Sequence, residues 1–232
     1  MRFEVEGRFK NKVITTDYKR KILSVIKSSM EDRLRGKIYN EDKPRNFTFS
    51  PFIIIEKIKE DKIYLKSENI KIFFSVDGMK EGWIFLNSLK KSKGKKIQFG
   101  ENELEITNVK TNTEKLIEDN IAVFKILSPI VIREQRKEKS DWYHDFDKKG
   151  IEILKRNICY QMRYDFPKSE LEGIEIQGLK TKRTIVKNYD IKYPVTLGSI
   201  MIKASSRILN RLYKRGIGSK TSLGHGMLEF MD

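Results

Sequence analysis

The segment from residue 216 to residue 226 has a composition that would let the backbone approach a phosphate group closely. It combines glycines, hydroxyl side chains and one lysine, at Gly216, Gly218, Ser219, Lys220, Thr221, Ser222, Gly224 and Gly226. Glycine has no Cβ to hold an anion away, so successive amides can form a concave anion site. The hydroxyl groups would add donors, and the lysine would add charge. The structural alternative is a helix that ends at Gly216 and turns into a strand.

Two familiar phosphate-binding loops do not fit this segment. A Walker loop needs a glycine directly before its Lys-Thr pair, but Ser219 precedes Lys220 and Thr221. A dinucleotide fingerprint needs a third glycine at position 221, followed by a long helix and a second strand. Only 6 residues follow Gly226. The segment therefore predicts a backbone anion site of another kind, which all eight residues named above would form.

Few side chains could supply acid–base or metal chemistry. The histidines are His144 and His225 and the one cysteine is Cys159, which excludes a multi-ligand zinc site and an internal disulfide. An imidazole between two glycines of the segment, at His225, could act as acid or base near neutral pH. The alternative for His225 is packing at the start of a strand. We expect no metal and no other cofactor.

The charge of the chain indicates a polyanionic partner. Lysine and arginine number 48 against 32 acidic residues, which gives a net charge of +16. Both halves carry the excess, and it is densest between residues 180 and 220, where 11 basic residues face 1 acid. A merely solvated face usually mixes charges of both signs. We therefore expect RNA-binding or DNA-binding contacts from Lys180, Lys182, Arg183 and Lys187.

Hydrophobic periodicity predicts the order strand–helix–strand–strand–helix–strand in the first half. A half-buried strand covers residues 1–9, and a helix begins after Asp17 and runs to about Leu34, ending near Gly36. Its apolar stripe is Ile22, Val25, Ile26 and Met30. The other expected elements are strands at 47–55, 62–66 and 70–76, a short helix at 80–91, and a closing hairpin at 97–99 and 103–109.

The second half repeats this order. The expected elements are a strand at 121–133, a helix from Asp145 or Asp147 through Met162, strands at 173–181 and 184–187 separated by a basic turn, a strand at 196–203, a helix capped by Ser205 or Ser206, and a strand at 227–230. This order, found twice, predicts an α+β fold of tandem ferredoxin-like domains, with antiparallel sheets and helices on one face. We expect domains at 1–115 and 116–232 that pack directly and form a basic cleft.

The hydropathy of the chain bears on its compartment. No apolar run of about 18 residues is present, as a membrane-spanning helix would need. The first ten residues lack the apolar middle of a signal peptide. With a single cysteine, these features predict a soluble cytoplasmic protein with no membrane partner.

The segment GIGSKTSLGHG, followed by a short strand, resembles the signature of the CRISPR-associated endoribonucleases that process precursor crRNA. These enzymes belong to the RAMP superfamily. Two further segments agree with this resemblance, Phe47–Ser50 after the first helix and Leu127–Val131 at the start of the second half. The length of the family and its tandem ferredoxin-like fold match the whole chain.

The resemblance implies that the protein binds a CRISPR repeat in precursor crRNA and cleaves it without a metal. The 2′-hydroxyl of the RNA would attack the adjacent phosphate and leave a 2′,3′-cyclic phosphate and a 5′-hydroxyl. This reaction needs a base for the 2′-oxygen, positive charge near the phosphorane and an acid for the leaving oxygen.

The sequence departs from the family at the general base. Many members have a histidine in or just after the first helix, but residues 32–50 contain none. Some members rely on lysines and tyrosines instead. The candidates for catalysis here are Lys37, Tyr39, Lys43 and His225, and Arg45 is a candidate for RNA binding. The alternative for the four residues of the 37–45 loop is that they are ordinary solubilising residues.

The missing histidine favours a second function class. A non-catalytic RNA-binding subunit of a CRISPR effector complex, from the same superfamily, would need no base. A third class is a basic α+β nucleic-acid protein unrelated to CRISPR. Repeat RNA is the expected partner in the first two classes, together with a second copy in a homodimer or the other subunits of an effector complex.

Overall fold

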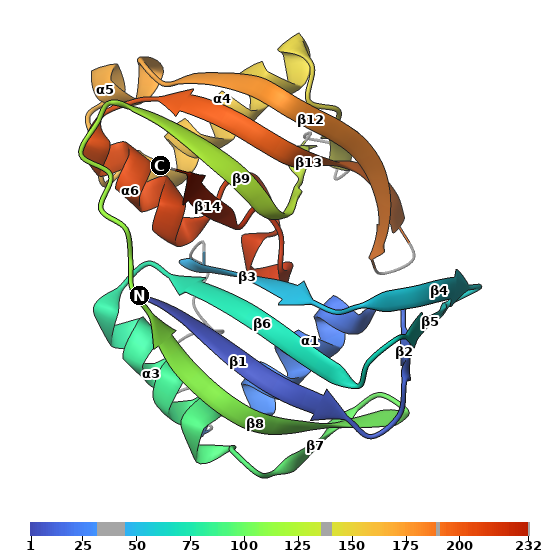
Figure 1. Ribbon diagram of the computed structural model, residues 1–232. Coiled ribbons are helices and arrows are strands. Elements are labelled where there is room, and N and C mark those ends of the chain that lie inside the picture. The colour runs from blue at the N-terminus through green and yellow to red at the C-terminus, as the bar shows by residue number, and fades with distance from the viewer. Residues whose placement is uncertain (32–44, 136–140, 189–190, 232) are drawn as a thin grey trace. The chain divides into compact units, whose positions relative to one another are not determined.

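Two compact units make up the chain. The computed structural model describes residues 1–31, 45–135, 141–188 and 191–231. Unit 1 is Met1–Glu114 and unit 2 is Lys115–Asp232. In each unit helices pack on one face of an antiparallel sheet, and Figure 1 labels the elements.

Unit 1 contains one large and one small antiparallel sheet. Its elements are β1 Arg2–Phe9, β2 Val13–Thr15, α1 Tyr18–Ser28, β3 Phe47–Phe52, β4 Ile55–Lys59, β5 Lys62–Leu65, β6 Asn69–Val76, α3 Met79–Lys91, β7 Lys96–Phe99 and β8 Asn102–Asn112. The strand order is β3-β6-β1-β8-β7 in the large sheet and β2-β5-β4 in the small one. Because β3 is an edge strand, Pro51 within it removes no hydrogen bond of a central ladder.

Aromatic side chains fill the helix-facing side of the large sheet. The rings of Phe3 and Phe74 stack at 4.9 Å, and Phe49 lies 5.8 Å from Phe74 on the next strand. Alternate residues of a strand point to one face, which is why the alternation in residues 1–9 buries Phe3 and Val5 together. The α1 stripe from Ile22 to Met30 is buried against this face, as predicted.

The opposite face of this sheet carries charges of both signs. On adjacent strands, Lys71 lies 3.0 Å from Glu4 and 3.4 Å from Glu6, and Lys110 lies 3.1 Å from Glu6. The hydrogen bond from Lys110, with a second one from Asn108, lowers the pKa of Glu6 to about 2. Carboxylate and ammonium groups thus satisfy one another on this face.

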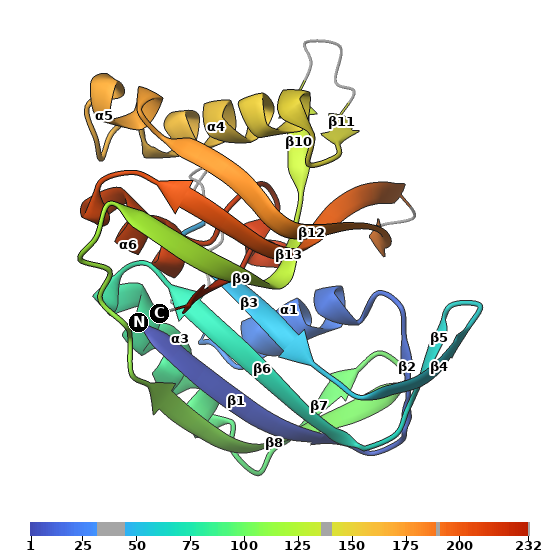
Figure 2. The ribbon, with the colours of Figure 1, turned by 45° about the horizontal axis from the view of Figure 1, so that its top comes forward.

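Unit 2 has the same strand order in its main sheet. Its elements are β9 Ile121–Ile130, β10 Ile132–Gln135, β11 Asp141–His144, α4 Lys148–Met162, α5 Lys168–Glu172, β12 Glu175–Asn188, β13 Ile191–Lys203, α6 Ser206–Arg215, the 3₁₀ turn η1 Thr221–Leu223, and β14 Leu228–Met231. The main sheet has the order β12-β13-β9-β14, and β10 pairs only with β11. Figure 2 shows the long β12–β13 hairpin below α4.

One apolar cluster joins α4 and α6 to the main sheet of unit 2. Phe124 on β9 and Ile200 on β13 are cross-strand partners and fully buried, and Leu154 and Leu209 reach them from the two helices. Asp147 caps α4 by accepting from the Gly150 amide at 2.7 Å, and Ser205 caps α6, so each cap comes from a residue that the sequence offered.

The matching strand orders confirm the tandem ferredoxin-like fold. In both units the first and third strands of the motif are central, with the second and fourth at their sides. The helix at residue 18 ends at Ser28, shorter than predicted, and Gly36 lies outside the described residues. The predicted strand at 47–55 is two strands, β3 and β4.

The basic turn expected near Lys182 is absent from the structure. Residues 175–188 form one continuous strand, which pairs with β13 up to Asn188 opposite Ile191. The prediction failed because residues 180–184 are lysine, arginine and threonine with no apolar residue among them, so no hydrophobic alternation marks them as part of a strand. Backbone pairing with β13 holds this segment extended instead.

Candidate nucleic-acid interface

The loop from Gly216 to Gly226 connects α6 to β14 through a sharply folded backbone. Its four glycines all have positive φ, from 68° at Gly226 to 84° at Gly218. A Cβ at Gly226 would lie 1.9 Å from the Ile217 carbonyl oxygen, and one at Gly218 would lie 2.6 Å from that of Val131. Only glycine fits these two positions, because backbone atoms occupy the space of a side chain.

Hydrogen bonds join this loop to the junction of β9 and β10. The Ser219 amide donates to the Val131 carbonyl at 2.8 Å, and the Gly226 amide donates to the Pro129 carbonyl at 2.9 Å. Just past the loop, the Met227 amide donates to the hydroxyl oxygen of Ser128 at 2.9 Å. The two segments of this half that the sequence singled out, 127–131 and 216–226, therefore form one structure.

Three of the four glycine amides of the loop already donate hydrogen bonds within the protein. All four glycines are buried, and the amides of Gly216, Gly224 and Gly226 donate to the carbonyls of Leu212, Thr221 and Pro129. This counts against the expected anion-binding role of these three residues, since a buried amide that already donates internally is not available to an anion. The glycines shape the loop instead.

The tip of the loop keeps the features that an anion site needs. Lys220, Thr221 and Ser222 are half-buried, and within the described part of the chain no acceptor meets their three amides. Lys220 is left-handed, with φ 61° and ψ 29°, and η1 follows at once. A left-handed residue followed by a helical one turns successive amides toward a common point, which is an anion-binding nest. Ser219 and Ser222 lie beside it with their hydroxyl groups.

Two stacked tyrosine rings hold the Lys220 side chain. The rings of Tyr143 on β11 and Tyr193 on β13 are 4.5 Å apart and nearly parallel at 13°. The Lys220 ammonium nitrogen lies 5.0 Å from the first ring and 4.5 Å from the second. A cation over aromatic faces is attracted to them and so is oriented by them. Burial raises the pKa of Tyr143, so its phenol keeps its proton and remains a donor.

His225 lies behind the tyrosine pair. Its side chain is 1% exposed, and its Nε2 lies 3.4 Å from the hydroxyl oxygen of Tyr193. This burial favours the packing alternative for His225 over the expected acid–base role.

His144 is held by an acid on the neighbouring strand. Its Nε2 lies 3.1 Å from Oε2 of Glu134. The other carboxylate oxygen of Glu134, Oε1, accepts a hydrogen bond from Arg156 at 3.1 Å. The hydrogen bond from Arg156 is the main reason that the pKa of Glu134 is lowered. The β10–β11 hairpin that positions Tyr143 is therefore braced at its base by side chains of β10, β11 and α4.

The predicted basic residues lie on the exposed part of the β12–β13 hairpin. Lys180, Lys182, Arg183 and Lys187 are all exposed along β12. Arg183 is paired with Asp145 at 2.6 Å. They belong to the same unit as the loop. Lys180 and Lys187 lie in a strand as predicted, whereas Lys182 and Arg183 lie in that strand and not in the predicted turn.

Three candidates for catalysis, Lys37, Tyr39 and Lys43, lie outside the described residues. Arg45 is described, half-buried and two residues before β3. The sequence analysis missed Tyr193 as a site residue, because nothing in the local pattern around it distinguishes it from any tyrosine in a strand. Its partner Tyr143 is distant in the sequence, and only the fold brings the two together.

Among the described residues, no three His, Cys, Asp or Glu side chains gather where they could hold a metal ion. In the same residues, no helix is long and apolar enough to cross a bilayer.

A family model decides the classification of the chain. Residues 110–230 match the C-terminal region of the CRISPR-associated protein Cas6, which is just over half of the sequence. The chain belongs to the Cas6 family. The match includes the β9–β10 junction, both tyrosines and the whole loop, so the site described above lies within the part that defines the family.

Individual relatives agree with this assignment. A CRISPR-associated endoribonuclease-like protein Cas6 of Pyrococcus furiosus is 28% identical over 198 residues, which is 80% of this chain and 79% of that protein. Among solved structures, a RAMP protein that binds different RNA substrates matches with a TM-score of 0.83, at 22% identity over the full length of both chains. A Cas6-related protein of Pyrococcus furiosus matches with a TM-score of 0.82, at 24% identity over 100% of this chain and 98% of its own. The structural matches show that the fold is shared.

Proposed function

We propose that this Cas6 family member binds CRISPR repeat RNA and cleaves it in the maturation of crRNA. The observation that carries the proposal is the tip of the 216–226 loop, where three half-buried residues have amides that no acceptor in the described residues meets, and where Lys220 adds a cation over two tyrosine rings. An RNA phosphate is the ligand that such a group fits, because it accepts several hydrogen bonds and carries a charge. The name of the Pyrococcus furiosus relative supports the choice of an endoribonuclease.

In the proposed reaction the RNA supplies its own nucleophile and no metal takes part. The 2′-oxygen attacks the adjacent phosphorus and gives its proton to a base, while the bond from phosphorus to the 5′-oxygen breaks. The leaving oxygen takes a proton, and the products are a 2′,3′-cyclic phosphate and a 5′-hydroxyl. The amides at Lys220, Thr221 and Ser222 would stabilise charge on the phosphorane, and holding the strand in line would supply much of the remaining rate.

Acid and base for this reaction would come from side chains that carry a proton. The candidates are Lys37, Tyr39 and Lys43, and Arg45 is a candidate for RNA binding. His225 is not among them, because its ring is buried. Lys180, Lys182, Arg183 and Lys187 would hold the strand outside the reacting nucleotide.

A second function is favoured by the state of the two histidines. His225 is buried and His144 is engaged with Glu134, so neither is placed as a free general base. A non-catalytic RNA-binding subunit of a CRISPR effector complex would tolerate this arrangement. It would bind repeat RNA through the same loop and leave it intact.

The test is cleavage of a transcript of the cognate repeat by excess protein in EDTA, with mass analysis of the product ends. One cut with a cyclic phosphate end supports the proposal. Tight binding with intact RNA under these single-turnover conditions supports the effector subunit instead. Equal affinity for random duplex DNA and for repeat RNA at the same salt concentration contradicts both.

The loop is tested by Lys220→Asn, since asparagine tolerates a left-handed backbone while the ammonium and its contacts with the two tyrosine rings are removed. We expect RNA affinity or cleavage to fall about tenfold, because a charged contact to phosphate is lost. The matched control is Lys66→Asn, at an exposed lysine of unit 1, which should change neither. An unchanged rate and affinity in Lys220→Asn would remove the loop from the site.

A further inference from the structure

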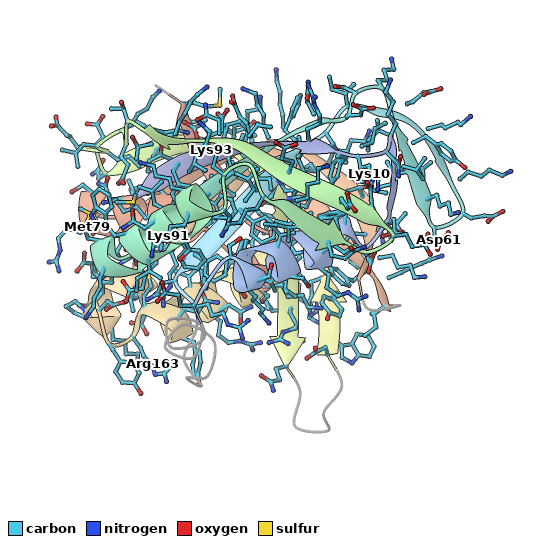
Figure 3. The ribbon with its side chains drawn as sticks, turned by 90° about the horizontal axis from the view of Figure 1, so that it is seen from below. Lys10, Asp61, Met79, Lys91, Lys93 and Arg163 are labelled. Atoms are coloured by element: carbon cyan, nitrogen blue, oxygen red, sulfur yellow. The ribbon has the colours of Figure 1, made fainter. Side chains whose placement is uncertain are left out.

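Unit 1 contains a large groove on the helix side of its sheet. The groove lies between α1, α3 and β7 and has a volume of about 1330 Å³. Figure 3 views this side, with Met79 and Lys91 labelled on α3 and with α1 beside it. A volume of this size exceeds the 300–1,000 Å³ of ordinary small-molecule pockets.

Lysines make up nearly all of the charged side chains that line this groove. They come from α3 and from the residues leading into β7, and they are Lys80, Lys90, Lys91, Lys95 and Lys96. Glu31 is the one acid in the lining, and it pairs with Lys91 at 3.2 Å. Both partners of this pair are largely exposed, so the pair is weak. In the described residues the other four lysines form no ion pair, and the groove is therefore strongly positive.

An exposed tryptophan lies among these lysines. Trp83 is 48% exposed on α3, while Phe85, Leu86 and Leu89 on the other face of the helix fill the core. It is three residues after Lys80 and four before Asn87, so the three side chains share one face of the helix. The groove thus places a stacking surface and an amide beside a row of positive charges.

The spacing of the lysines indicates a polymer rather than a single nucleotide. Lys80 and Lys90 are ten residues apart on α3, which is about 15 Å along the helix axis. That distance is longer than one phosphate group can bridge. An indole stacks on the face of a base, and the base faces of a duplex are already stacked, so an unpaired strand is the better fit.

We infer that the α1–α3 groove of unit 1 is a binding site for single-stranded RNA, separate from the 216–226 loop of unit 2. The choice of RNA over DNA rests on the proposed function, whereas the preference for an unpaired strand rests on the groove. In this site Trp83 stacks on a base, Asn87 faces a base edge, and the lysines neutralise the phosphates on either side.

Tryptophan fluorescence tests the inference directly, because the chain has only 2 tryptophans, Trp83 and Trp142. The full-length Trp142→Phe variant reports on Trp83 alone. We expect oligouridylate of about ten nucleotides to quench it and an RNA duplex of the same length to leave it unchanged. The complementary Trp83→Phe variant reports on Trp142 in unit 2.

Charge removal in the Trp142→Phe background gives a second readout. Replacement of Lys90, Lys95 and Lys96 by alanine should weaken oligouridylate binding at least about tenfold and lower its salt slope by about two. The matched control replaces the exposed lysines Lys59, Lys62 and Lys66 of the β4–β5 hairpin, and should alter the affinity by less than about threefold.

Several outcomes would overturn the inference. One is unchanged Trp83 fluorescence at RNA concentrations that quench Trp142. Another is quenching of Trp83 by duplex RNA as strong as that by oligouridylate. Equally strong quenching by polyglutamate would indicate a general anion surface. None of these readouts depends on cleavage. Quenching of Trp83 without cleavage of repeat RNA would contradict the proposed function alone, and cleavage with a silent Trp83 would contradict this inference alone.

Discussion

Single residues of the 216–226 loop divide the work between shape and binding. The glycines are buried and provide backbone angles that other residues avoid. Lys220 adopts such an angle, with φ 61°, although it is not a glycine. A left-handed non-glycine residue costs about 1–2 kcal/mol and occurs most often at functional sites. Here the cost is offset by the contact of its ammonium with two tyrosine rings.

Gly226→Ala should destabilise the protein by about 3 kcal/mol or more, because the new Cβ would overlap the Ile217 carbonyl oxygen. Gly94→Ala is the matched control. Gly94 also has a positive φ, of 76°, but nothing lies within 4 Å of the place for its Cβ. The Gly94→Ala variant should lose only about 1 kcal/mol of the free energy of unfolding, which is the cost of the backbone angle alone. Urea unfolding measures both, and equal losses would show that the crowding at Gly226 is relieved cheaply.

For single residues, the sequence reveals local patterns but does not reveal which distant residues come into contact. Gly216 and its neighbours are conspicuous because four glycines lie within eleven residues. Their structural role is not visible in the sequence, because only the fold shows that the Ile217 carbonyl crowds Gly226 and that the Val131 carbonyl crowds Gly218. Tyr143 and Tyr193 come together only after β11 packs against β13.

Secondary-structure elements differ in whether their charged residues are balanced by residues of opposite charge. On strands β1, β6 and β8 of unit 1, acids and lysines of adjacent strands form ion pairs on the face of the sheet opposite the helices. On the β12–β13 hairpin the basic residues greatly outnumber the acids. The first arrangement neutralises a surface, and the second leaves it ready to attract phosphates.

Glu6→Gln should show how the neutralised face depends on pH. The folded state lowers the pKa of Glu6 from its ordinary 4.5 to about 2, so its contribution is complete above pH 4.5 and is lost as the pH falls toward 2. We expect the variant to lose up to about 1 kcal/mol at pH 7 and progressively less below pH 4.5. Urea unfolding at pH 7 and pH 3 measures this.

A loss that stays constant between pH 7 and pH 3 would mean that the carboxylate charge of Glu6 contributes nothing. Glu103→Gln is the control, because Glu103 has one ion pair, with Lys10 at 3.4 Å, where Glu6 has two and a further hydrogen bond from Asn108. We expect a smaller loss there at pH 7.

Elements with an apolar stripe were predicted well, and those without one were not. Ile22, Val25 and Ile26 marked α1 correctly because that helix buries one face. Residues 180–184 of β12 have no apolar side chain, and α5, which spans Lys168–Glu172, is too short to show a period. The end of α1 was placed too late, since α1 stops at Ser28 before any glycine or proline.

Across the whole molecule, the net charge of +16 sets how binding depends on salt. Each phosphate that the protein neutralises releases counterions, so affinity falls as salt rises. The charge also bears on specificity, because electrostatic attraction alone does not distinguish one nucleic acid from another. Discrimination must come from contacts to the bases or from the shape of the RNA, because contacts to phosphate are the same in every sequence.

The Lys180→Ala/Lys182→Ala double variant should lower the slope of log affinity against log salt by about one unit or slightly more for repeat RNA. The matched control is Lys168→Ala/Lys203→Ala, which removes two exposed lysines of the same unit that already pair with Glu172 and Glu175. It should leave the slope unchanged. Binding titrations at several salt concentrations measure both, and equal slopes in the two variants would place the RNA elsewhere.

The hydrogen bonds from the loop back to Pro129 and Val131 have a consequence for biosynthesis. A ribosome releases β9 long before it reaches Gly226, and domains generally fold as units while the chain grows. The nest therefore takes shape only after β14 has left the exit tunnel. The lysines of unit 1 are synthesised before this nest can form, so a growing chain can attract phosphates before it has the loop that we propose to bind one.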